Sequence, residues 1–327
     1  MLQILFNLCR KQLLILNPMP SKTYLGIEIG GTKLQLVLGN EKAQILKRFR
    51  FVVDRNAGAE EIRQHIAKTL HHLKTEKLSA IGVGYGGPID RPTGTVLVSY
   101  QIEGWSGFPL KEWLGDLTGV STVVDNDANV AALGEVLHGA GRNYNNVLYI
   151  TLGSGVGSGI VLHKKIYHGA FPGEAEMGHI RLDKTGRTIE SACSGWAVDK
   201  KIRDAVLNYP EGILAKLVNE KGPGAEARSL PEAISLGDVQ AREILDKTCD
   251  DLAFGISHAV HLLHPEIIIL GGGLSFIGEP LRKLVAQKIT GYLMDVFQPG
   301  PPILLSLLKE DAVPVGALEL AIQHKNN

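Results

Sequence analysis

Two glycines, a hydroxyl group and a cation follow one another at residues 30–33. Residues 24–33 read YLGIEIGGTK, so a largely apolar run ends at Gly30 and Gly31 and is followed by Thr32 and Lys33. Glycine lets backbone N–H groups approach an anion closely, and the hydroxyl and ammonium groups add further donors. The stretch is therefore typical of a phosphate site, although it matches neither a Walker loop nor G-x-G-x-x-G. A tight hairpin turn explains the same residues, so this stretch alone leaves both interpretations open.

The residues around this stretch predict the elements that would hold it. Residues 24–38 alternate apolar and small side chains and break at Gly39-Asn40, which predicts a hairpin. A third strand is expected over 44–53. A helix is expected over 58–73, where Ile62, Ile66, Leu70 and Leu73 share one face. The apolar run at 80–88, AIGVGYGGP, predicts the next buried strand.

A similar pattern recurs later in the chain. The segments NVLYITLG (146–153) and GIVLHKKIYHG (159–169) flank a glycine-containing bend and predict a second hairpin. A helix is expected over 237–264, followed by the apolar strand EIIILGGG at 266–273. Two α/β halves that each begin with a glycine hairpin indicate an internal duplication. Such halves, facing each other across a cleft, would hold a nucleotide and close on a second substrate.

Length and composition limit the class of protein. The 327 residues suffice for two ordinary domains, and 34 Lys and Arg balance 34 Asp and Glu, which argues against a nucleic-acid-binding protein. Cys9, Cys193 and Cys249 are scattered and odd in number. This cysteine usage favours a reducing, cytoplasmic location and offers neither a disulfide framework nor a cysteine-rich zinc site.

The first twenty residues are leucine-rich and need a separate interpretation. Arg10 and Lys11 interrupt the apolar run, which is too short to span a bilayer and lacks the small-residue cleavage site of a signal peptide. We expect a loose extension, with the true start at Met19 and no membrane partner.

Taken together, the motifs resemble those of the ROK family (repressor, open reading frame, kinase). The resemblance runs from about residue 24 to about residue 322 and depends on the order and spacing of six segments: IEIGGTK, GVGYGGPID, VVDNDANVAALGE, LYITLGSGVGSGIV, GEAEMGHI and IIILGGGLS. It implies an α/β, actin-like (ribonuclease H-like) ATPase fold with two α/β domains around a cleft. We expect an extension over 1–22, a smaller domain over 23–125 with helix 312–323 packing back onto it, and a larger domain over 126–311.

The resemblance also implies a site for Mg²⁺-ATP. The terminal phosphates would lie between the first hairpin and the second, that is, between Gly30, Gly31, Thr32 and Lys33 on one side and Thr151, Gly153, Ser154 and Gly155 on the other. Gly271, Gly272 and Gly273 would pass near the adenosine and open a helix N-terminus, or simply form a tight turn. Glu28 stands where many relatives carry an aspartate that holds magnesium through water. The alternative for Glu28 is an acidic residue facing solvent on an edge strand.

By the same resemblance, the segment DNDAN supplies the chemistry. Asp127 is either the general base that takes a proton from the sugar hydroxyl or only an N-cap for the helix expected over 128–137. The sugar would be bound by Gly87, Asn126, Asp127, Glu176, His179 and Glu190, with Glu174 as a competing glutamate. Trp105, in a loop at the mouth of the cleft, is expected to pack rather than to face the sugar. Asp125 has no assigned role.

One departure from the family concerns zinc. Most family members place a cysteine-rich, zinc-binding loop after the histidine, whereas this chain reads HIRLDKTGRTIESACSGW with Cys193 alone. A structural zinc site needs about four ligands, so we expect no structural zinc. Some polyphosphate-using glucokinases of the family also lack these cysteines, which leaves polyphosphate open as an alternative donor.

These features favour a homodimeric sugar kinase that phosphorylates a hexose or an N-acetylhexosamine with ATP. A non-catalytic sugar-binding regulator of the same family is the alternative. A repressor would need a DNA-binding domain before the first hairpin, and about 23 residues are too few for one. A Rossmann dehydrogenase interpretation of GVGYGG fails because the acidic residue expected about 20 positions later is poorly placed.

Overall fold

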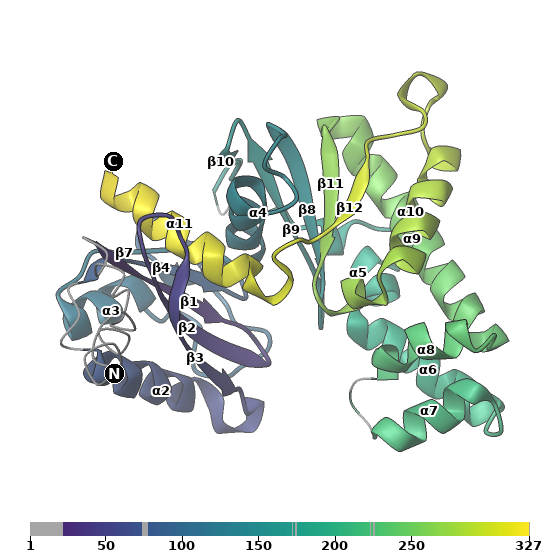
Figure 1. Cartoon of the computed structure of the whole chain (residues 1–327), viewed down its shortest axis with the longest axis horizontal. Coiled ribbons are helices and arrows are strands. Elements are labelled where there is room, and N and C mark those ends of the chain that lie inside the picture. The colour runs from purple at the N-terminus through teal and green to yellow at the C-terminus, as the bar shows by residue number, and fades with distance from the viewer. Residues whose placement is uncertain are drawn as a thin grey trace, which may run out of the picture.

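The computed structural model describes residues 22–73, 78–171, 173, 175–222, 224 and 226–326. The expected extension over 1–22 lies outside the described residues apart from Lys22, and so does Glu174. Two five-stranded sheets stand side by side, and helices cover their faces (Figure 1).

The first sheet has the strand order β3-β2-β1-β4-β7. Its strands are β1 (Thr23–Ile29), β2 (Lys33–Gly39), β3 (Ile45–Val52), β4 (Leu78–Tyr85) and β7 (Thr122–Asn126). The hairpin predicted over 24–38 is formed by β1 and β2, which pair in antiparallel register, and β4 runs parallel to β1. On one face the apolar residues of α2 (Gly58–His72) and α3 (Leu110–Thr118) share a core with the strands. A two-stranded ribbon of β5 (Ile89–Asp90) and β6 (Thr95–Val96) lies beside this sheet.

The second sheet repeats that arrangement. Its order is β10-β9-β8-β11-β12, with β8 (Asn146–Leu152), β9 (Val156–Leu162), β10 (Lys165–Ile166), β11 (Ile267–Gly271) and β12 (Ile303–Leu305). Again an antiparallel hairpin, β8–β9, is followed by a parallel strand, β11. Six helices belong to this half: α5 (Ile189–Cys193), α6 (Gly195–Asn208), α7 (Ile213–Lys221), α8 (Leu230–Ser235), α9 (Val239–Leu263) and α10 (Glu279–Ile289). The duplication predicted from the two glycine hairpins is therefore confirmed in the topology.

Short 3₁₀ helices complete the two halves. They are η1 (Arg55–Ala57), η2 (Met177–His179), η3 (Glu226–Ser229), η4 (Gly273–Ile277), η5 (Thr290–Tyr292), η6 (Asp295–Phe297) and η7 (Lys309–Asp311).

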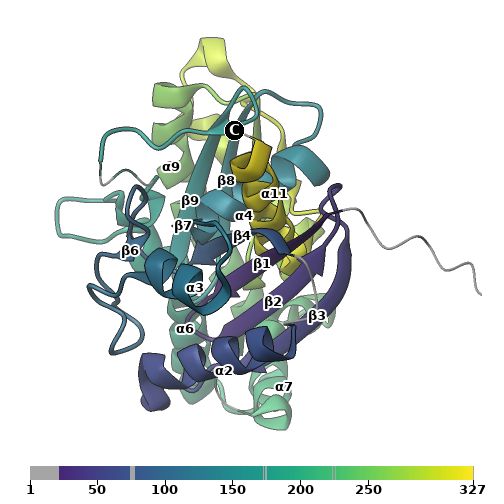
Figure 2. The same ribbon diagram turned by 90° about the vertical axis from the view of Figure 1, so that its left-hand side faces the viewer.

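Two helices, α4 (Asp127–His138) and α11 (Ala312–Asn326), cross between the sheets (Figures 1 and 2). The last helix extends to Asn326, three residues beyond the predicted end, and packs against β1 and β4 of the first sheet. Glycines permit this approach: a Cβ atom at Gly82 would lie 2.0 Å from the Ala317 carbonyl oxygen. Likewise, a Cβ atom at Gly316 would lie 1.8 Å from the Val130 carbonyl oxygen of α4.

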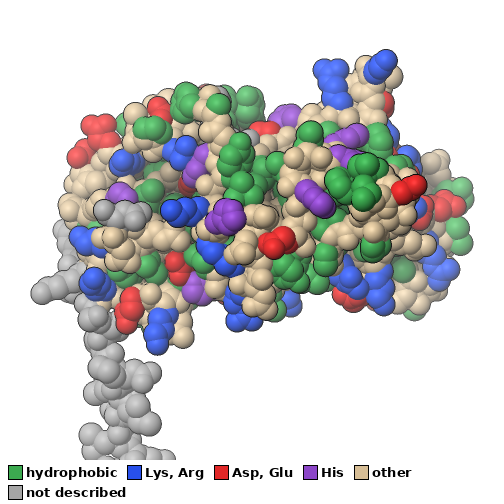
Figure 3. All heavy atoms as spheres, turned by 90° about the horizontal axis from the view of Figure 1, so that it is seen from above, with side chains coloured by type: hydrophobic (Ala, Val, Ile, Leu, Met, Phe, Trp, Pro, Cys, Tyr) green, Lys and Arg blue, Asp and Glu red, His purple; other side chains and the backbone are tan. Residues whose placement is uncertain are grey.

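The charged side chains on the face shown in Figure 3 do not segregate by sign. Lysines and arginines are interspersed with aspartates and glutamates across it. Among the described residues, no helix combines the length and the apolar character that a bilayer crossing requires.

Candidate active site

A cavity of about 760 Å³ lies between the two glycine hairpins. The residues predicted for ATP and magnesium that line it are Glu28, Thr32, Lys33, Thr151, Gly153, Ser154, Gly272 and Gly273, and the predicted base Asp127 lines it too. The cavity lining does not include Gly30, Gly31, Gly155 or Gly271. Segments that lie more than 200 residues apart in the sequence thus form one wall.

The first hairpin is both a tight turn and part of the cavity. The Gly30 N–H donates to the Lys33 carbonyl oxygen at 3.0 Å, which closes the turn. A Cβ atom at Gly31 would lie 1.7 Å from Oε1 of Gln101, so the Gln101 amide occupies the space above this glycine. The two interpretations of the stretch are compatible, because Thr32 and Lys33 reach the cavity from the turn.

The second hairpin is fixed by a carboxylate. The Glu190 Oε2 atom accepts a hydrogen bond of 2.9 Å from the Val156 N–H. A Cβ atom at Gly155 would lie 2.4 Å from that same oxygen. A residue with a side chain at position 155 would collide with Glu190, so the turn requires glycine there. Gly155 therefore has a packing role against Glu190.

The glycines at 271–273 do not open a long helix. Gly272 has φ 77°, a left-handed conformation that favours glycine, and the 3₁₀ helix η4 that follows has only five residues. The α-helix α10 begins at Glu279. The expectation of a helix N-terminus at these glycines is thus wrong in part, because a short 3₁₀ turn separates them from the helix.

Glu28 lies on β1, the central strand of its sheet, and is only 7% exposed. The interpretation of Glu28 as a solvent-facing residue on an edge strand is therefore wrong. Its Oε1 atom lies 3.0 Å from Lys33 Nζ, and its Oε2 atom accepts a 2.7 Å hydrogen bond from Gln35. Burial raises the pKa of Glu28, and the Lys33 ammonium and the Gln35 amide oppose that shift.

Asp127 is the first residue of α4, and the N-cap is Asn126. The Asn126 Oδ1 atom accepts from the backbone N–H groups of Ala128 at 2.9 Å and Asn129 at 3.3 Å. The interpretation of Asp127 as an N-cap is therefore wrong, because its neighbour fills that role and leaves the Asp127 carboxyl facing the cavity. Burial raises the pKa of Asp127 to about 7, and the nearby Glu28 and Glu176 carboxylates act in the same direction.

Apart from Asp127, the residues predicted for the sugar do not line the cavity between the hairpins, although Glu176 lies near enough to Asp127 to influence its pKa. The Asn126 Nδ2 atom donates to the Gly87 carbonyl oxygen at 3.3 Å. Glu176 precedes η2, which ends at His179, and both side chains are exposed. Gly178, between them, packs against Glu190, because a Cβ atom placed there would lie 3.5 Å from the Glu190 Cβ atom. These contacts join Gly87 to Asn126, and the segment around Gly178 to Glu190.

Asp125, which had no role from the sequence, anchors this region. Its Oδ2 atom lies 2.6 Å from Nε2 of His168, and its Oδ1 atom accepts from the Asn126 N–H and from the Asn129 side chain. His168 follows β10 of the other sheet, so this pair links the two halves on the sugar side. The sequence could not indicate the pair, because nothing in it relates residues 125 and 168.

Trp105 is fully buried and meets the rings of Tyr85 and Phe108 edge-on. The prediction that it packs under its loop is confirmed.

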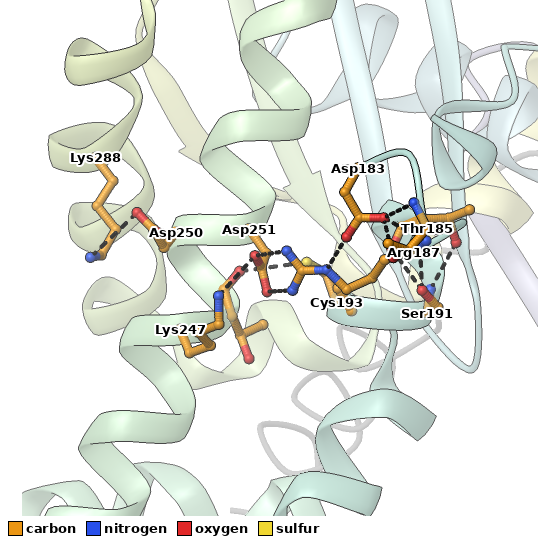
Figure 4. Close-up of polar contacts among 12 residues, drawn as sticks. Asp183, Thr185, Arg187, Ser191, Cys193, Lys247, Asp250, Asp251 and Lys288 are labelled. Carbon is orange, nitrogen blue, oxygen red and sulfur yellow. Dashed lines mark hydrogen bonds and ion pairs between the residues drawn. The ribbon is translucent and has the colours of Figure 1, made fainter. Parts of the chain in front are cut away.

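Polar contacts hold the segment between His179 and Glu190 (Figure 4). The Arg187 guanidinium donates two 3.0 Å hydrogen bonds to the carboxylate of Asp251 on α9, and its Nε atom donates to Asp183 at 3.2 Å. Lys247 reaches the same Asp251 carboxylate at 3.3 Å. An arginine–aspartate network therefore ties this loop to α9.

Within the described part of the chain, no group of three or more His, Cys, Asp or Glu side chains is arranged to hold a metal ion.

Several cavity residues were not predicted from the sequence. Trp196 and Asp199 of α6, Arg228 of η3, Phe276 of η4 and Lys309 of η7 all line it. They come from four helical elements without a common motif, and only the fold brings them together.

The motifs, their order and this cavity agree with one family. A family model described as ROK family matches residues 24–324. The chain belongs to the ROK family. This ROK protein is 32% identical to a glucokinase of Thermotoga maritima, over 92% of this chain and 98% of that one. It therefore has the actin-like ATPase fold, with two α/β domains, that the motifs implied.

Solved ROK structures resemble the chain over its length. A ROK family glucokinase from Streptomyces griseus, in complex with glucose and AMPPNP, is 30% identical and superposes with a TM-score of 0.81, covering 92% of this chain and 99% of its own. An inorganic polyphosphate/ATP-glucomannokinase from an Arthrobacter species is 25% identical, with a TM-score of 0.63 over 93% and 100% of the two chains.

Proposed function

We propose that this ROK protein is a sugar kinase that transfers the γ-phosphoryl group of ATP to a hydroxyl group of a hexose or an N-acetylhexosamine. The observation that carries this proposal is the Asp127 carboxyl, which faces a cavity between two glycine hairpins and has a pKa raised to about 7. A base with a pKa close to the working pH is suited to accept a proton from a hydroxyl group.

In the proposed reaction, the sugar oxygen attacks the γ-phosphorus. The new O–P bond forms while the bond between the γ-phosphorus and the β–γ bridging oxygen breaks, so that ADP leaves with the bonding electrons. Asp127 receives the proton of the attacking hydroxyl. The sugar is held so that this hydroxyl points at Asp127, and the residues that hold it are Gly87, Asn126, Glu176, His179 and Glu190.

The donor lies between the hairpins in this proposal. The terminal phosphates are held from one side by the first hairpin, through Gly30, Gly31, Thr32 and Lys33. They are held from the other side by the second hairpin, through Thr151, Gly153, Ser154 and Gly155. Gly271, Gly272 and Gly273 adjoin the adenosine. ATP is favoured over polyphosphate because the cavity extends beyond the hairpins to Phe276, Arg228 and Pro231, where a nucleoside has room.

The acidic residues Glu28 and Asp127 in the cavity wall suit a magnesium ion that arrives with the nucleotide. Mg²⁺ prefers oxygen ligands and keeps several waters, and the Glu28 carboxylate, which pairs with Lys33 and Gln35, lies near Asp127. Glu28 would hold the ion through water, and the bound ion would neutralise charge on the transferred phosphoryl group. We propose no structural zinc.

The remaining proposals concern organisation. Residues 23–125, with α11, would form the smaller domain and residues 126–311 the larger one, with the sugar bound as they close. We also propose a cytoplasmic homodimer with no nucleic-acid or membrane partner. The two buried free thiols, Cys193 and Cys249, support a reducing compartment, and the balance of 34 Lys and Arg against 34 Asp and Glu argues against a nucleic-acid partner.

The test is an ADP-release assay with Mg²⁺-ATP and a panel of glucose, mannose, fructose, N-acetylglucosamine and N-acetylmannosamine. We expect turnover of at least one sugar and a loss of about 10²–10⁴-fold in kcat for Asp127→Asn. Asp116→Asn, which removes an exposed carboxylate of α3, serves as the control. An Asp127→Asn protein with near-normal kcat refutes the catalytic role. Sugar binding without turnover in the wild type identifies a regulator, and much faster turnover with polyphosphate identifies the other donor.

A further inference from the structure

The Arg55 side chain of one half stacks on Trp196, a cavity-lining residue of the other half. Arg55 begins η1, directly after the first three strands, and Trp196 is the second residue of α6 in the other half. The guanidinium carbon of Arg55 lies 4.6 Å from the centroid of the Trp196 ring. Trp196 lines the cavity, and Arg55, which is not itself among the lining residues, stacks on its ring.

Each partner is attached to one of the two glycine hairpins. The Arg55 Nε atom donates a 2.8 Å hydrogen bond to the Gly31 carbonyl oxygen. On the other side, the N–H of Gly195 donates to the Gly153 carbonyl oxygen at 2.7 Å, and Gly195 directly precedes Trp196. The contact between Arg55 and Trp196 therefore connects the tips of the β1–β2 and β8–β9 hairpins.

The charge of Arg55 is not neutralised by a carboxylate. Within the described residues Arg55 forms no ion pair, and its Nε–Gly31 bond is the one hydrogen bond that its side chain makes. In contrast, Arg48, Arg50 and Arg63 of the same half each pair with a carboxylate. A guanidinium has five N–H donors in a planar fork, so the two Nη groups of Arg55 remain available beside both hairpins.

We propose that Arg55 is a donor-binding residue, with Trp196 holding its guanidinium beside the two hairpins so that the Nη groups bind oxygens of the outermost phosphate of the donor. This inference rests on the proposed kinase function and adds a residue to it. Guanidinium groups bind phosphate oxygens in a two-pronged geometry that lysine cannot reproduce. The aromatic face fixes the plane of the fork before the anion arrives.

The first experiment separates the two substrates. We expect Arg55→Met to raise the KM for ATP by about 10–100-fold, the range for a lost hydrogen bond to a charged group, while the KM for the sugar changes less than about twofold. Arg55→Lys should recover part of the affinity. Trp196→Phe should resemble the wild type, and Trp196→Leu should raise the KM for ATP by about threefold or more, since only phenylalanine keeps an aromatic face.

Arg63→Met is the matched control. Arg63 also stacks on aromatic rings, 4.7 Å from the Phe108 centroid, but it is paired with Glu60. Its replacement should leave the KM for ATP unchanged. An equal effect of Arg63→Met and Arg55→Met overturns the proposal, as does an Arg55→Met enzyme whose KM for ATP is within twofold of the wild type.

The second experiment uses binding alone, so that it stands even if no sugar is turned over. Calorimetry compares Mg²⁺-AMPPNP, inorganic tripolyphosphate and adenosine on the wild type and on Arg55→Met. We expect Arg55→Met to bind Mg²⁺-AMPPNP and tripolyphosphate more weakly than the wild type does. Its affinity for adenosine should be unchanged, because in the proposal Arg55 contacts phosphate and not the base. Equal loss for all three ligands identifies Arg55 as merely structural and overturns the proposal. If Arg55→Met does not fold, Arg55→Lys is compared in its place and must show a smaller loss of the same pattern.

Discussion

Replacing Asp127 by asparagine should stabilise the protein at neutral and alkaline pH while it abolishes catalysis. The carboxyl is held partly buried at the start of α4, near the Glu28 and Glu176 carboxylates, and its pKa is raised to about 7 from 3.8. An acid whose folded-state pKa is raised stabilises the folded state while it is protonated. That contribution is fully present below about pH 4 and is lost as the pH rises through about 7.

The size of the effect follows from the shift. A change of about 3 pKa units at about 1.36 kcal/mol each sets an upper limit of about 4 kcal/mol on the cost of ionising Asp127 in the folded state. Water in the cavity screens the charge, so we expect about 1–2 kcal/mol to develop between pH 5 and pH 8. Asparagine cannot ionise, so Asp127→Asn avoids this cost.

The assay is urea denaturation of the wild type, Asp127→Asn and Asp116→Asn at several pH values between 5 and 8. The difference in unfolding free energy between Asp127→Asn and the wild type should grow with pH and level off above about pH 7. Asp116→Asn should follow the wild type within about 0.5 kcal/mol, since exposed substitutions have small effects. A difference that stays constant over this pH range would contradict the raised pKa.

Three further predictions follow from other contacts of the site. Glu28→Gln removes a like charge near Asp127, so the pH of half-maximal kcat/KM should move downward; an upward shift or none would contradict this. Arg187→Met leaves the buried Asp251 carboxylate without its two-pronged partner and should lower the unfolding free energy by about 1–3 kcal/mol in a urea titration. The control, Lys221→Met, breaks an exposed ion pair with Glu232 and should lower the unfolding free energy by less than about 0.5 kcal/mol. Elemental analysis of the purified chain should find no stoichiometric zinc, and about one zinc per chain would refute that prediction.

The topology was predictable because it depends on local patterns. Alternating apolar residues on both sides of Gly30 and Gly31 predicted the first hairpin, and the same pattern around residues 153–158 predicted the second. Helical spacing of Ile62, Ile66 and Leu70 located α2, whose buried face contains these three residues. Each of these patterns lies within about 16 residues, so neither distant contacts nor side-chain packing was needed.

The cavity wall was only partly predictable, because long-range packing decides it. The stretch around Asp127 fitted both an N-cap and a base, and only the hydrogen bonds of Asn126 in the folded structure exclude the N-cap role for Asp127. Trp196, Phe276 and Lys309 reach the cavity from segments whose positions depend on packing across the whole larger half. The pairing of Asp125 with His168 also joins a strand of the first sheet to a loop that follows the second sheet.

The packing of α11 on the first sheet has a consequence for folding during synthesis. Strands β1 to β7 are complete at Asn126, but the helix that covers one of their faces begins at Ala312. At about 5–20 residues per second, the ribosome needs roughly 10–40 seconds to make the intervening chain. During that interval the apolar face around Tyr24, Val37 and Ala80, later covered by Leu318 and Ala321, is open to chaperones. The first glycine hairpin therefore reaches its final support only after α11 has been made.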